Sequence, residues 1–331
     1  MNTTCHILGL GHAVPETVLT NADMERMVDT NDEWIVSRTG IKERRVAGPG
    51  ETCVTLSHLA SQRALDDAGM KAEELTHILV ATFSADFIIP SAACMLAHRL
   101  GVAGRMAMDV SAACSGFLYA METARAIVAL HPEAKVLVAA CDIVTSRVNY
   151  ADRGTCVLFG DGAGAAIVSA RPGPGGSKAQ VLDVLLSSDG GVGDLLTIRG
   201  GGSGCTYKPG DTIRDDFFVQ MQGREVYKHA VRSMSAICES VLEKNGFSKD
   251  EVDVFIPHQA NMRIIEAVGK KLDMPEHKVF TNVQHYGNTS AASVPIALSE
   301  AREQGCIKDG NLVLLGTFGG GFTWGSALVR F

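Results

Sequence analysis

The sequence predicts an α/β protein whose sheets are buried under helices on both faces. Near-continuous apolar stretches, at residues 77–82, 135–140 and 311–315, alternate with stretches typical of helices. The chain has 331 residues and is 46% hydrophobic, so it can bury a large core. It contains no run of about 18 apolar residues, so we expect no membrane span.

Two pairs of segments resemble each other in the same order, which indicates an internal duplication. Residues 65–80 align with residues 242–257, and each copy predicts a helix, a glycine C-cap, an acidic turn and a buried strand. Residues 157–168 resemble residues 313–329, which are apolar strands joined through glycines. Two such similarities in one order favour duplication over chance.

A Pro/Gly cluster at residues 171–178 separates the two copies. We therefore expect an N-terminal half, residues 1–172, that carries a nucleophilic cysteine. The C-terminal half, residues 178–331, would carry a histidine and an asparagine that act with it.

The composition excludes several classes of protein. Thirty Lys and Arg stand against 37 Asp and Glu, and the net charge of −7 argues against a nucleic-acid binder. Nine cysteines without a CxxC pair, and no signal-peptide pattern, favour reduced thiols in the cytoplasm. No His/Cys cluster has metal-ligand spacing and no complete dinucleotide fingerprint occurs, so we expect neither metal nor cofactor.

Cys114 has the setting of a nucleophile. It lies in a small-residue segment between an apolar stretch and a predicted helix, residues 117–130. Unpaired N–H groups and the helix dipole at such a position favour the thiolate. The dipole supplies only ~1 kcal/mol, less than one pKa unit, so a second group is needed. The other eight cysteines lack this setting and are interpreted as buried small residues.

His258 and Asn288 are the candidates for that second group. His258 follows the predicted strand 252–256 and precedes the predicted helix 262–272, at a strand end where α/β proteins place ligand chemistry. Asn288, taken alone, is equally typical of a helix N-cap. The consecutive glycines 319–321 let backbone N–H groups approach a ligand, which suits an oxyanion hole.

With these residues assembled, the chain resembles the thiolase-like condensing enzymes, and most of all the β-ketoacyl-[acyl carrier protein] synthase III family. The resemblance covers essentially the whole chain. A Cys-His-Asn set differs from the Cys-His-His of elongating synthases and from thiolases, which have a second catalytic Cys. The matching motifs are residues 31–41, 90–94, 152–155, 159–165, 257–265, 287–295 and 318–325.

The resemblance implies a thiolase-like fold, with duplicated βαβαβ halves in a five-layered α-β-α-β-α sandwich. It implies a homodimer that initiates fatty-acid synthesis by decarboxylative Claisen condensation. Cys114 would take the acyl group from a short acyl-CoA, acetyl-CoA first among them. Malonyl-[acyl carrier protein] would then lose CO2 and attack, giving 3-oxoacyl-[acyl carrier protein]. His258 and Asn288 would stabilise the malonyl thioester oxygen, and the N–H groups of Cys114 and Gly320 the other oxyanion.

The resemblance also assigns three sets of binding residues. CoA would be bound by Thr30, Trp34, Arg38, Arg153 and Asn261. The acyl pocket would be lined by Phe83, Ile89, Val144, Phe159 and Phe318. The acidic carrier protein would dock on the basic strip of Arg263, Lys270 and Lys271. Phe83 and Ile89 depart from the residues common in the family, and an aromatic side chain at position 83 predicts a short starter.

Three alternatives stay open. The first is a related condensing enzyme or acyltransferase of secondary metabolism with a different acyl donor or acceptor. The second is a non-condensing acyltransferase or thioesterase that uses Cys114 only as an acyl relay; the intact His258 and Asn288 argue against it. The third is a binding module, disfavoured because no catalytic position is lost.

Overall fold

One nine-stranded sheet runs through the chain, in the order β11-β12-β13-β8-β1-β7-β6-β4-β5. The computed structural model describes residues 4–173 and 176–331. The strands of this sheet are β1 Cys5–Ala13, β4 His77–Ala81, β5 Met106–Val110, β6 Lys135–Asp142, β7 Gly162–Ser169, β8 Ala179–Ser188, β11 Val254–Pro257, β12 Leu312–Gly319 and β13 Thr323–Arg330. Two small ribbons pair β2 Val18–Thr20 with β3 Glu43–Arg45, and β9 Leu196–Thr197 with β10 Gln220–Met221.

Helices cover this sheet and connect its strands. They are α1 Asn21–Glu25, α2 Asp32–Thr39, α3 Cys53–Ala68, α4 Ala92–Arg99, α5 Gly116–Leu130, α6 Arg153–Cys156, α7 Gly223–Asn245, α8 Met262–Lys271, α9 Val283–Tyr286 and α10 Ser293–Glu303. None of the helices in the described part of the chain is long and apolar enough to cross a bilayer.

The strand order repeats in the two halves of the sheet. The order β1-β7-β6-β4-β5 is matched by β8-β13-β12-β11, and a parallel bridge from Phe255 to Val279 takes the place of the fifth strand. The parallel and antiparallel pairings also correspond. This symmetry is what duplication produces. The boundary at 171–178 stays a prediction, and residues 174 and 175 of it lie outside the described residues.

The repeated helix–turn–strand unit predicted from the sequence occurs in both halves. Helices α3 and α7 each end on a glycine in the left-handed conformation, Gly69 at φ +62° and Gly246 at φ +73°. In the acidic turn that follows, Glu74 accepts the Lys71 N–H in one half and Glu251 accepts the Ser248 N–H in the other. Strands β4 and β11 come next.

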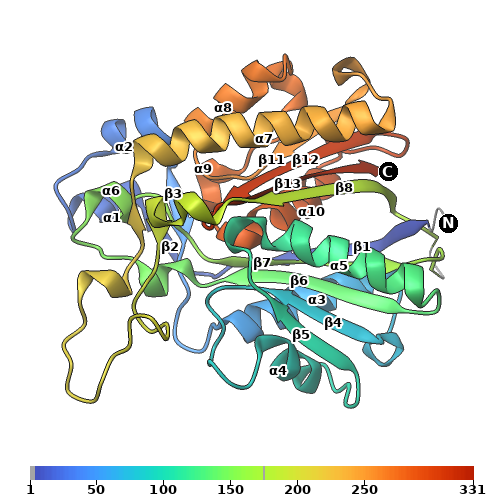
Figure 1. Ribbon diagram of the computed structural model, residues 1–331, viewed down its shortest axis with the longest axis horizontal. Coiled ribbons are helices and arrows are strands. Elements are labelled where there is room, and N and C mark those ends of the chain that lie inside the picture. The colour runs from blue at the N-terminus through green and yellow to red at the C-terminus, as the bar shows by residue number, and fades with distance from the viewer. Residues whose placement is uncertain (1–3, 174–175) are drawn as a thin grey trace.

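Helices α5 and α10 form the middle of five layers (Figure 1). Phe117 of α5 and Leu298 of α10 belong to one apolar cluster that takes in strands of both halves of the sheet. Each such fully buried side chain stabilises the fold by about 1.5–3 kcal/mol. Helices α3 and α4 cover the outer face of one half, and α7 and α8 the outer face of the other. The predicted five-layered α-β-α-β-α sandwich is therefore confirmed.

The turns that follow strands β5, β11 and β12 converge on one region. Cys114 follows β5, His258 follows β11, and residues 319–321 end β12 and follow it. The turn Ala113–Ser115 also packs against the turn Ser290–Ala292. Ligand chemistry in α/β proteins is usually found at such strand ends.

Candidate active site

Cys114 lies in a short 3-10 turn, Ala113–Ser115, between β5 and α5. Ala113 has a left-handed backbone, with φ +45°, which costs roughly 1–3 kcal/mol in a residue with a side chain. Two hydrogen bonds clamp the turn to β13. Ser115 Oγ donates to the Thr323 carbonyl at 3.0 Å, and Thr323 Oγ1 donates to the Ala112 carbonyl at 2.8 Å.

Gly319 brings the glycine run against the nucleophile. A Cβ at this position would lie 2.6 Å from the Cys114 amide nitrogen, so only glycine fits there. The approach places Gly320 on the wall of the same cavity as Cys114. Backbone from two distant segments therefore borders the space around the sulfur, which is where an oxyanion hole would have to be built.

Two cavities meet at Cys114. The first, of about 490 Å³, also contains His258 and Asn288. Its remaining polar and aromatic lining includes Arg38, Arg224, Tyr227, Asn261, Arg263, Phe159 and Phe318. The second, of about 390 Å³, is lined largely by apolar side chains and glycines, among them Phe83, Val144, Phe159, Leu196, Gly200 and Gly320. The predicted triad thus shares one cavity, and the sulfur also faces a second.

Burial controls the titration of the thiol. It raises the pKa of Cys114 to about 12, against a smaller lowering from the Ser290 hydroxyl. The sequence predicted that the helix start favours the thiolate only weakly and that a second group is needed. In the structure, desolvation of the charged sulfur outweighs the roughly 1 kcal/mol available from a helix terminus. The proton must therefore leave as the sulfur reacts.

His258 is a neutral imidazole. It is 2% exposed, and burial lowers its pKa to about 4. Its Nδ1 lies 2.8 Å from Ser293 Oγ, which also accepts the Gln259 N–H at 2.9 Å. A Ser293 hydroxyl that donates to Nδ1 leaves the imidazole proton on Nε2. Such a histidine is suited to donating a hydrogen bond rather than to accepting a proton.

Asn288 makes a local backbone contact and also lines the cavity. Its Oδ1 accepts the Ser290 N–H at 2.9 Å in an Asx turn, and the N-cap of the turn Ser290–Ala292 is Thr289, so the N-cap interpretation is wrong. The amide nitrogen is left to face the cavity that it lines with His258. The backbone of Asn288 is held by Leu158 and Gly160 through hydrogen bonds of 2.8 and 3.1 Å.

Three of the predicted CoA-binding residues lie together. The guanidinium carbons of Arg38 and Arg153 lie 4.8 and 4.7 Å from the ring centroid of Trp34. Thr30 Oγ1 is buried without a hydrogen-bonding partner in the described part of the chain. Asn261 lines the larger cavity, but its Oδ1 also caps α8 by accepting the Ile264 N–H at 3.0 Å.

The predicted acyl-pocket residues are only partly brought together. Phe83, Val144 and Phe159 line the smaller cavity beside the sulfur. Phe318 instead lines the larger cavity with His258. Ile89 is 87% exposed and lines neither cavity, because it lies in an apolar loop on the surface.

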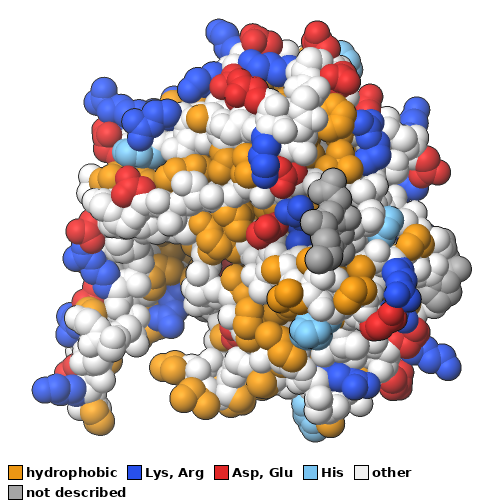
Figure 2. Space-filling model, turned by 45° about the vertical axis from the view of Figure 1, so that its right-hand side comes forward, with side chains coloured by type: hydrophobic (Ala, Val, Ile, Leu, Met, Phe, Trp, Pro, Cys, Tyr) orange, Lys and Arg blue, Asp and Glu red, His pale blue; other side chains and the backbone are white. Residues whose placement is uncertain are grey.

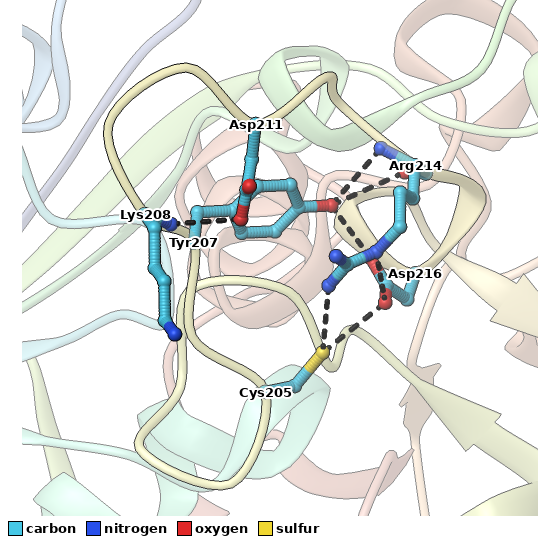
Figure 3. A network of polar contacts seen from close by, with 6 residues as sticks. All are labelled: Cys205, Tyr207, Lys208, Asp211, Arg214 and Asp216. Atoms are coloured by element: carbon cyan, nitrogen blue, oxygen red, sulfur yellow. Dashed lines mark hydrogen bonds and ion pairs between the residues drawn. The ribbon is translucent and has the colours of Figure 1, made fainter.

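A long loop supplies another wall of the smaller cavity through Gly200 and its neighbours. The loop carries its own polar network (Figure 3). Tyr207 OH donates to Asp216 Oδ1 at 2.6 Å, and the Arg214 guanidinium and the Cys205 thiol contact the other carboxylate oxygen. The glycine-rich sequence of this loop gives no sign of such contacts between side chains.

The predicted docking residues lie on α8. Arg263 lines the rim of the larger cavity, with its guanidinium carbon 5.8 Å from the ring centroid of Tyr227. Lys270 and Lys271 are exposed in the last turn. Positions 263 and 270 are two turns apart and share a face of the helix.

Sequence reasoning missed three polar residues around the triad: Asp142, Ser290 and Ser293. All three are buried, and Ser293 contacts His258 directly. A carboxylate that ends an otherwise apolar strand was the available signal for Asp142. The two serines lie in a small-residue segment whose only evident role was to cap a helix.

The fold and the site define a class of protein. A half-buried cysteine on a strand-to-helix turn shares a cavity with a neutral histidine and an asparagine amide, inside a duplicated five-layered sandwich. These are the features of a thiolase-like condensing enzyme.

Comparisons with known proteins give the family within this class. Residues 108–190 match the family model 3-Oxoacyl-[acyl-carrier-protein (ACP)] synthase III, and residues 242–331 match the model of its C terminal. The Beta-ketoacyl-[acyl-carrier-protein] synthase III of Oleidesulfovibrio alaskensis is 58% identical over 330 residues, covering 100% of both chains. That of Desulfotalea psychrophila is 48% identical, covering 98% of this chain and 99% of the other.

Solved structures of the same family are also similar to this chain. The 3-oxoacyl-[acyl-carrier-protein] synthase III of Aquifex aeolicus is 44% identical with a TM-score of 0.89, covering 99% of this chain and 100% of that one. The Thermus thermophilus structure is 39% identical with a TM-score of 0.90, covering 98% and 99%. The chain belongs to the 3-oxoacyl-[acyl-carrier-protein] synthase III family. The predicted enzyme, which condenses an acyl-CoA with malonyl-[acyl carrier protein] to initiate fatty-acid synthesis, is confirmed.

Proposed function

We propose that Cys114 carries the acyl group in a two-step reaction. The observation that supports this most is the position of its sulfur where two cavities meet. An acyl-CoA enters through the larger cavity, the sulfur attacks the thioester carbon, and CoA leaves as the free thiol. The acyl chain then occupies the smaller cavity. The N–H groups of Cys114 and Gly320 stabilise the negative oxygen that forms during attack.

The second step uses the larger cavity again. Malonyl-[acyl carrier protein] delivers its malonyl thioester there, and loss of CO2 places negative charge on the thioester oxygen. The Nε2–H of neutral His258 and the amide of Asn288 donate hydrogen bonds to this oxygen. The carbanion attacks the acyl carbon on Cys114, and the cysteine is released. Trp34, Arg38, Arg153, Thr30 and Asn261 bind the CoA or the pantetheine arm of the carrier protein.

The choice of acceptor tests this function against the secondary-metabolism alternative. A priming β-ketosynthase of a polyketide pathway is 31% identical with a TM-score of 0.86, so that alternative has a structural relative. Condensation should be measured with malonyl-[acyl carrier protein] and with malonyl-CoA at equal concentrations. A clear preference for the carrier-bound substrate supports fatty-acid initiation, whereas equal use or a preference for a free acceptor supports the alternative.

We propose a short starter such as acetyl. Phe83 and Phe159 stand on the wall of the cavity that receives the acyl chain. Phe83→Thr should raise kcat/KM for branched or longer acyl-CoA at the expense of acetyl-CoA. The effect should be about 10–200-fold, the range of one to a few methylenes in an apolar pocket. Kinetics with acetyl-, butyryl-, isobutyryl- and octanoyl-CoA measure it. A preference of the unmutated enzyme for octanoyl-CoA would contradict the short starter.

We propose that the carrier protein docks on the basic face of α8. The exposed Lys270 and Lys271 suit an acidic partner, with Arg263 at the rim of the cavity. Lys270→Glu combined with Lys271→Glu should raise KM for malonyl-[acyl carrier protein] roughly tenfold at low salt and less at high salt. The KM for acyl-CoA should stay unchanged and is the internal control. An unchanged KM for the carrier protein at low ionic strength would place docking elsewhere.

We further propose a cytoplasmic homodimer. All nine cysteines are free thiols, as a reducing compartment requires. Phe87, Ile88 and Ile89 form an apolar loop that is 57%, 92% and 87% exposed. Hydrophobic side chains also gather along the lower part of one face (Figure 2). A second copy of the chain would cover the loop, and that is the route by which Ile89 would reach an acyl pocket.

A further inference from the structure

A buried carboxylate and a buried hydroxyl near the nucleophile have no part in the function proposed above. Asp142 ends β6 and is 0% exposed. Ser290 begins the turn Ser290–Ala292, which packs against both β6 and the turn that carries Cys114. Ser290 also lines the smaller cavity together with Cys114.

The hydrogen bonds of Asp142 are unevenly divided between its two oxygens. Oδ1 accepts three: from Thr82 Oγ1 at 3.0 Å, Phe83 N at 2.9 Å and Ser84 Oγ at 2.9 Å. Oδ2 accepts only the Ala291 N–H, at 3.3 Å. With a single donor against three on Oδ1, Oδ2 retains room for a further hydrogen bond.

Ser290 lies between this carboxylate and the thiol. Its neighbour Ala291 donates to Asp142 Oδ2, and Ser290 itself shares the wall of the smaller cavity with Cys114. The hydroxyl also lowers the pKa of both Cys114 and Asp142. In the described part of the chain this buried hydroxyl has no hydrogen-bonding partner, so its donor and acceptor positions are both available. Hydrogen bonds of catalytic groups often tighten only when substrate binds. The backbone of Ser290 is left-handed, with φ +52°, a strain typical of functional positions.

We propose that Ser290 and Asp142 relay the proton of the Cys114 thiol during acylation. The thiol proton passes to Ser290 Oγ while the Ser290 proton passes to Asp142 Oδ2, and the sulfur electron pair attacks the acyl-CoA thioester carbon. When the bond to CoA breaks, the proton returns through the same hydroxyl to the leaving sulfur. No proton or electron is gained or lost overall. The inference rests on the proposed acylation of Cys114. Ser290 is then a catalytic residue, and Asp142 acts through it.

Asp142 is a better proton acceptor than His258. Burial raises the pKa of Asp142 to about 6 and lowers the pKa of His258 to about 4. Asp142 still remains mostly ionised at neutral pH. The Nδ1 atom of His258 is also engaged by Ser293. The two half-reactions would therefore use different groups.

The pH at which the relay fails is set by Asp142. The other titratable groups around the carboxylate are the thiols of Cys114, Cys141 and Cys53, with His258 in the adjoining cavity. Burial raises the pKa of Cys114 and of Cys141, whereas that of His258 lies near 4. Because the pKa of Asp142 is raised, the carboxylate loses its basicity as pH falls through about 6.

Two rates test the relay in Asp142→Asn and Ser290→Gly. The first is alkylation of Cys114 by iodoacetamide between pH 5 and 9 without any CoA; the second is acylation by acetyl-CoA, by quenched flow and mass spectrometry. In the unmutated protein both should rise through pH 6 and then level off. In both variants the two rates should be about 10²-fold lower at pH 7, and the rise through pH 6 should be absent. Alkylation should then rise only in proportion to hydroxide.

Two controls separate the relay from a structural role. Ser84→Ala removes a hydrogen bond to Oδ1 and should move the step to higher pH without abolishing it. Condensation by enzyme acylated beforehand through long incubation should stay within about threefold of the unmutated rate. Glycine tolerates the left-handed backbone of position 290. Ser290→Gly also leaves the four hydrogen bonds to Asp142 in place. If Asp142→Asn does not fold, the Ser290→Gly variant alone therefore tests the relay.

The relay is refuted if both variants alkylate and acylate at the unmutated rates with the step near pH 6 intact. An equal loss in acylation and in condensation of pre-acylated enzyme would likewise refute it, because that pattern marks a structural role. Absence of any acyl-enzyme in the unmutated protein would overturn the proposed function instead. In that case the dependence of the alkylation rate on pH would still show whether the relay exists.

Discussion

Cys114→Ala should abolish formation of the acyl-enzyme and reduce condensation by roughly 10⁴-fold or more. No other cysteine lies on the turn where the two cavities meet. Intact-protein mass spectrometry after incubation with acetyl-CoA measures the loss directly. The unmutated protein should gain one acetyl group, and the variant none.

The exposed cysteines provide matched controls for this experiment. Cys94 and Cys306 are the most accessible thiols by residue exposure, so adventitious acylation would occur there first. Cys306→Ala should keep both acylation and condensation. The free energy of unfolding of the Cys114→Ala protein should lie within about 1 kcal/mol of that of the unmutated one, because only one sulfur atom is removed. An acetyl adduct that persists in Cys114→Ala would contradict the assignment.

The sequence was sufficient to predict the architecture because its signals are local and repeated. The segments 65–80 and 242–257 each contain a glycine-capped helix, an acidic turn and an apolar strand, and each forms that unit. The continuity of the sheet across β1 and β8 had no such signal. Pairing between distant strands depends on tertiary packing, which local patterns do not encode.

The candidate site was predictable where the residue type itself carries the chemistry. Cys114, His258 and Asn288 are reactive or strongly polar groups in small-residue turns, and all three line one cavity. The protonation of the thiol was not predictable. A helix start is visible in a sequence, whereas the burial that raises the Cys114 pKa arises from segments far away in the chain.

Ile89 and Phe318 show that the sequence does not predict which side chains shape the acyl pocket. Their assignment to the acyl pocket came from resemblance alone. In the single chain Phe318 lies beside His258 and Ile89 lies on the surface. Which side of a cavity an apolar side chain faces depends on neighbouring backbone segments rather than on its own hydrophobicity.

His258→Ala and Asn288→Ala should each slow malonyl decarboxylation and condensation by about 10²–10³-fold. Both side chains lie on the larger cavity and are assigned to the same developing oxyanion. Acylation of Cys114 should fall far less, because burial keeps the His258 pKa near 4 and makes it a poor acceptor for the thiol proton. Release of CO2 from labelled malonyl-[acyl carrier protein] and the rate of acetylation by acetyl-CoA measure the two half-reactions separately.

The double variant makes the prediction sharper. Groups that stabilise one transition state are far from additive, so His258→Ala combined with Asn288→Ala should lose little more than the worse single variant. Ser293→Ala is the matched control for the histidine. It removes the hydroxyl on Nδ1 but leaves the imidazole, so it should give a smaller loss confined to the decarboxylation step. If all these variants slowed acylation as much as decarboxylation, His258 and Asn288 would act on the cysteine, and the division between the two half-reactions would be wrong.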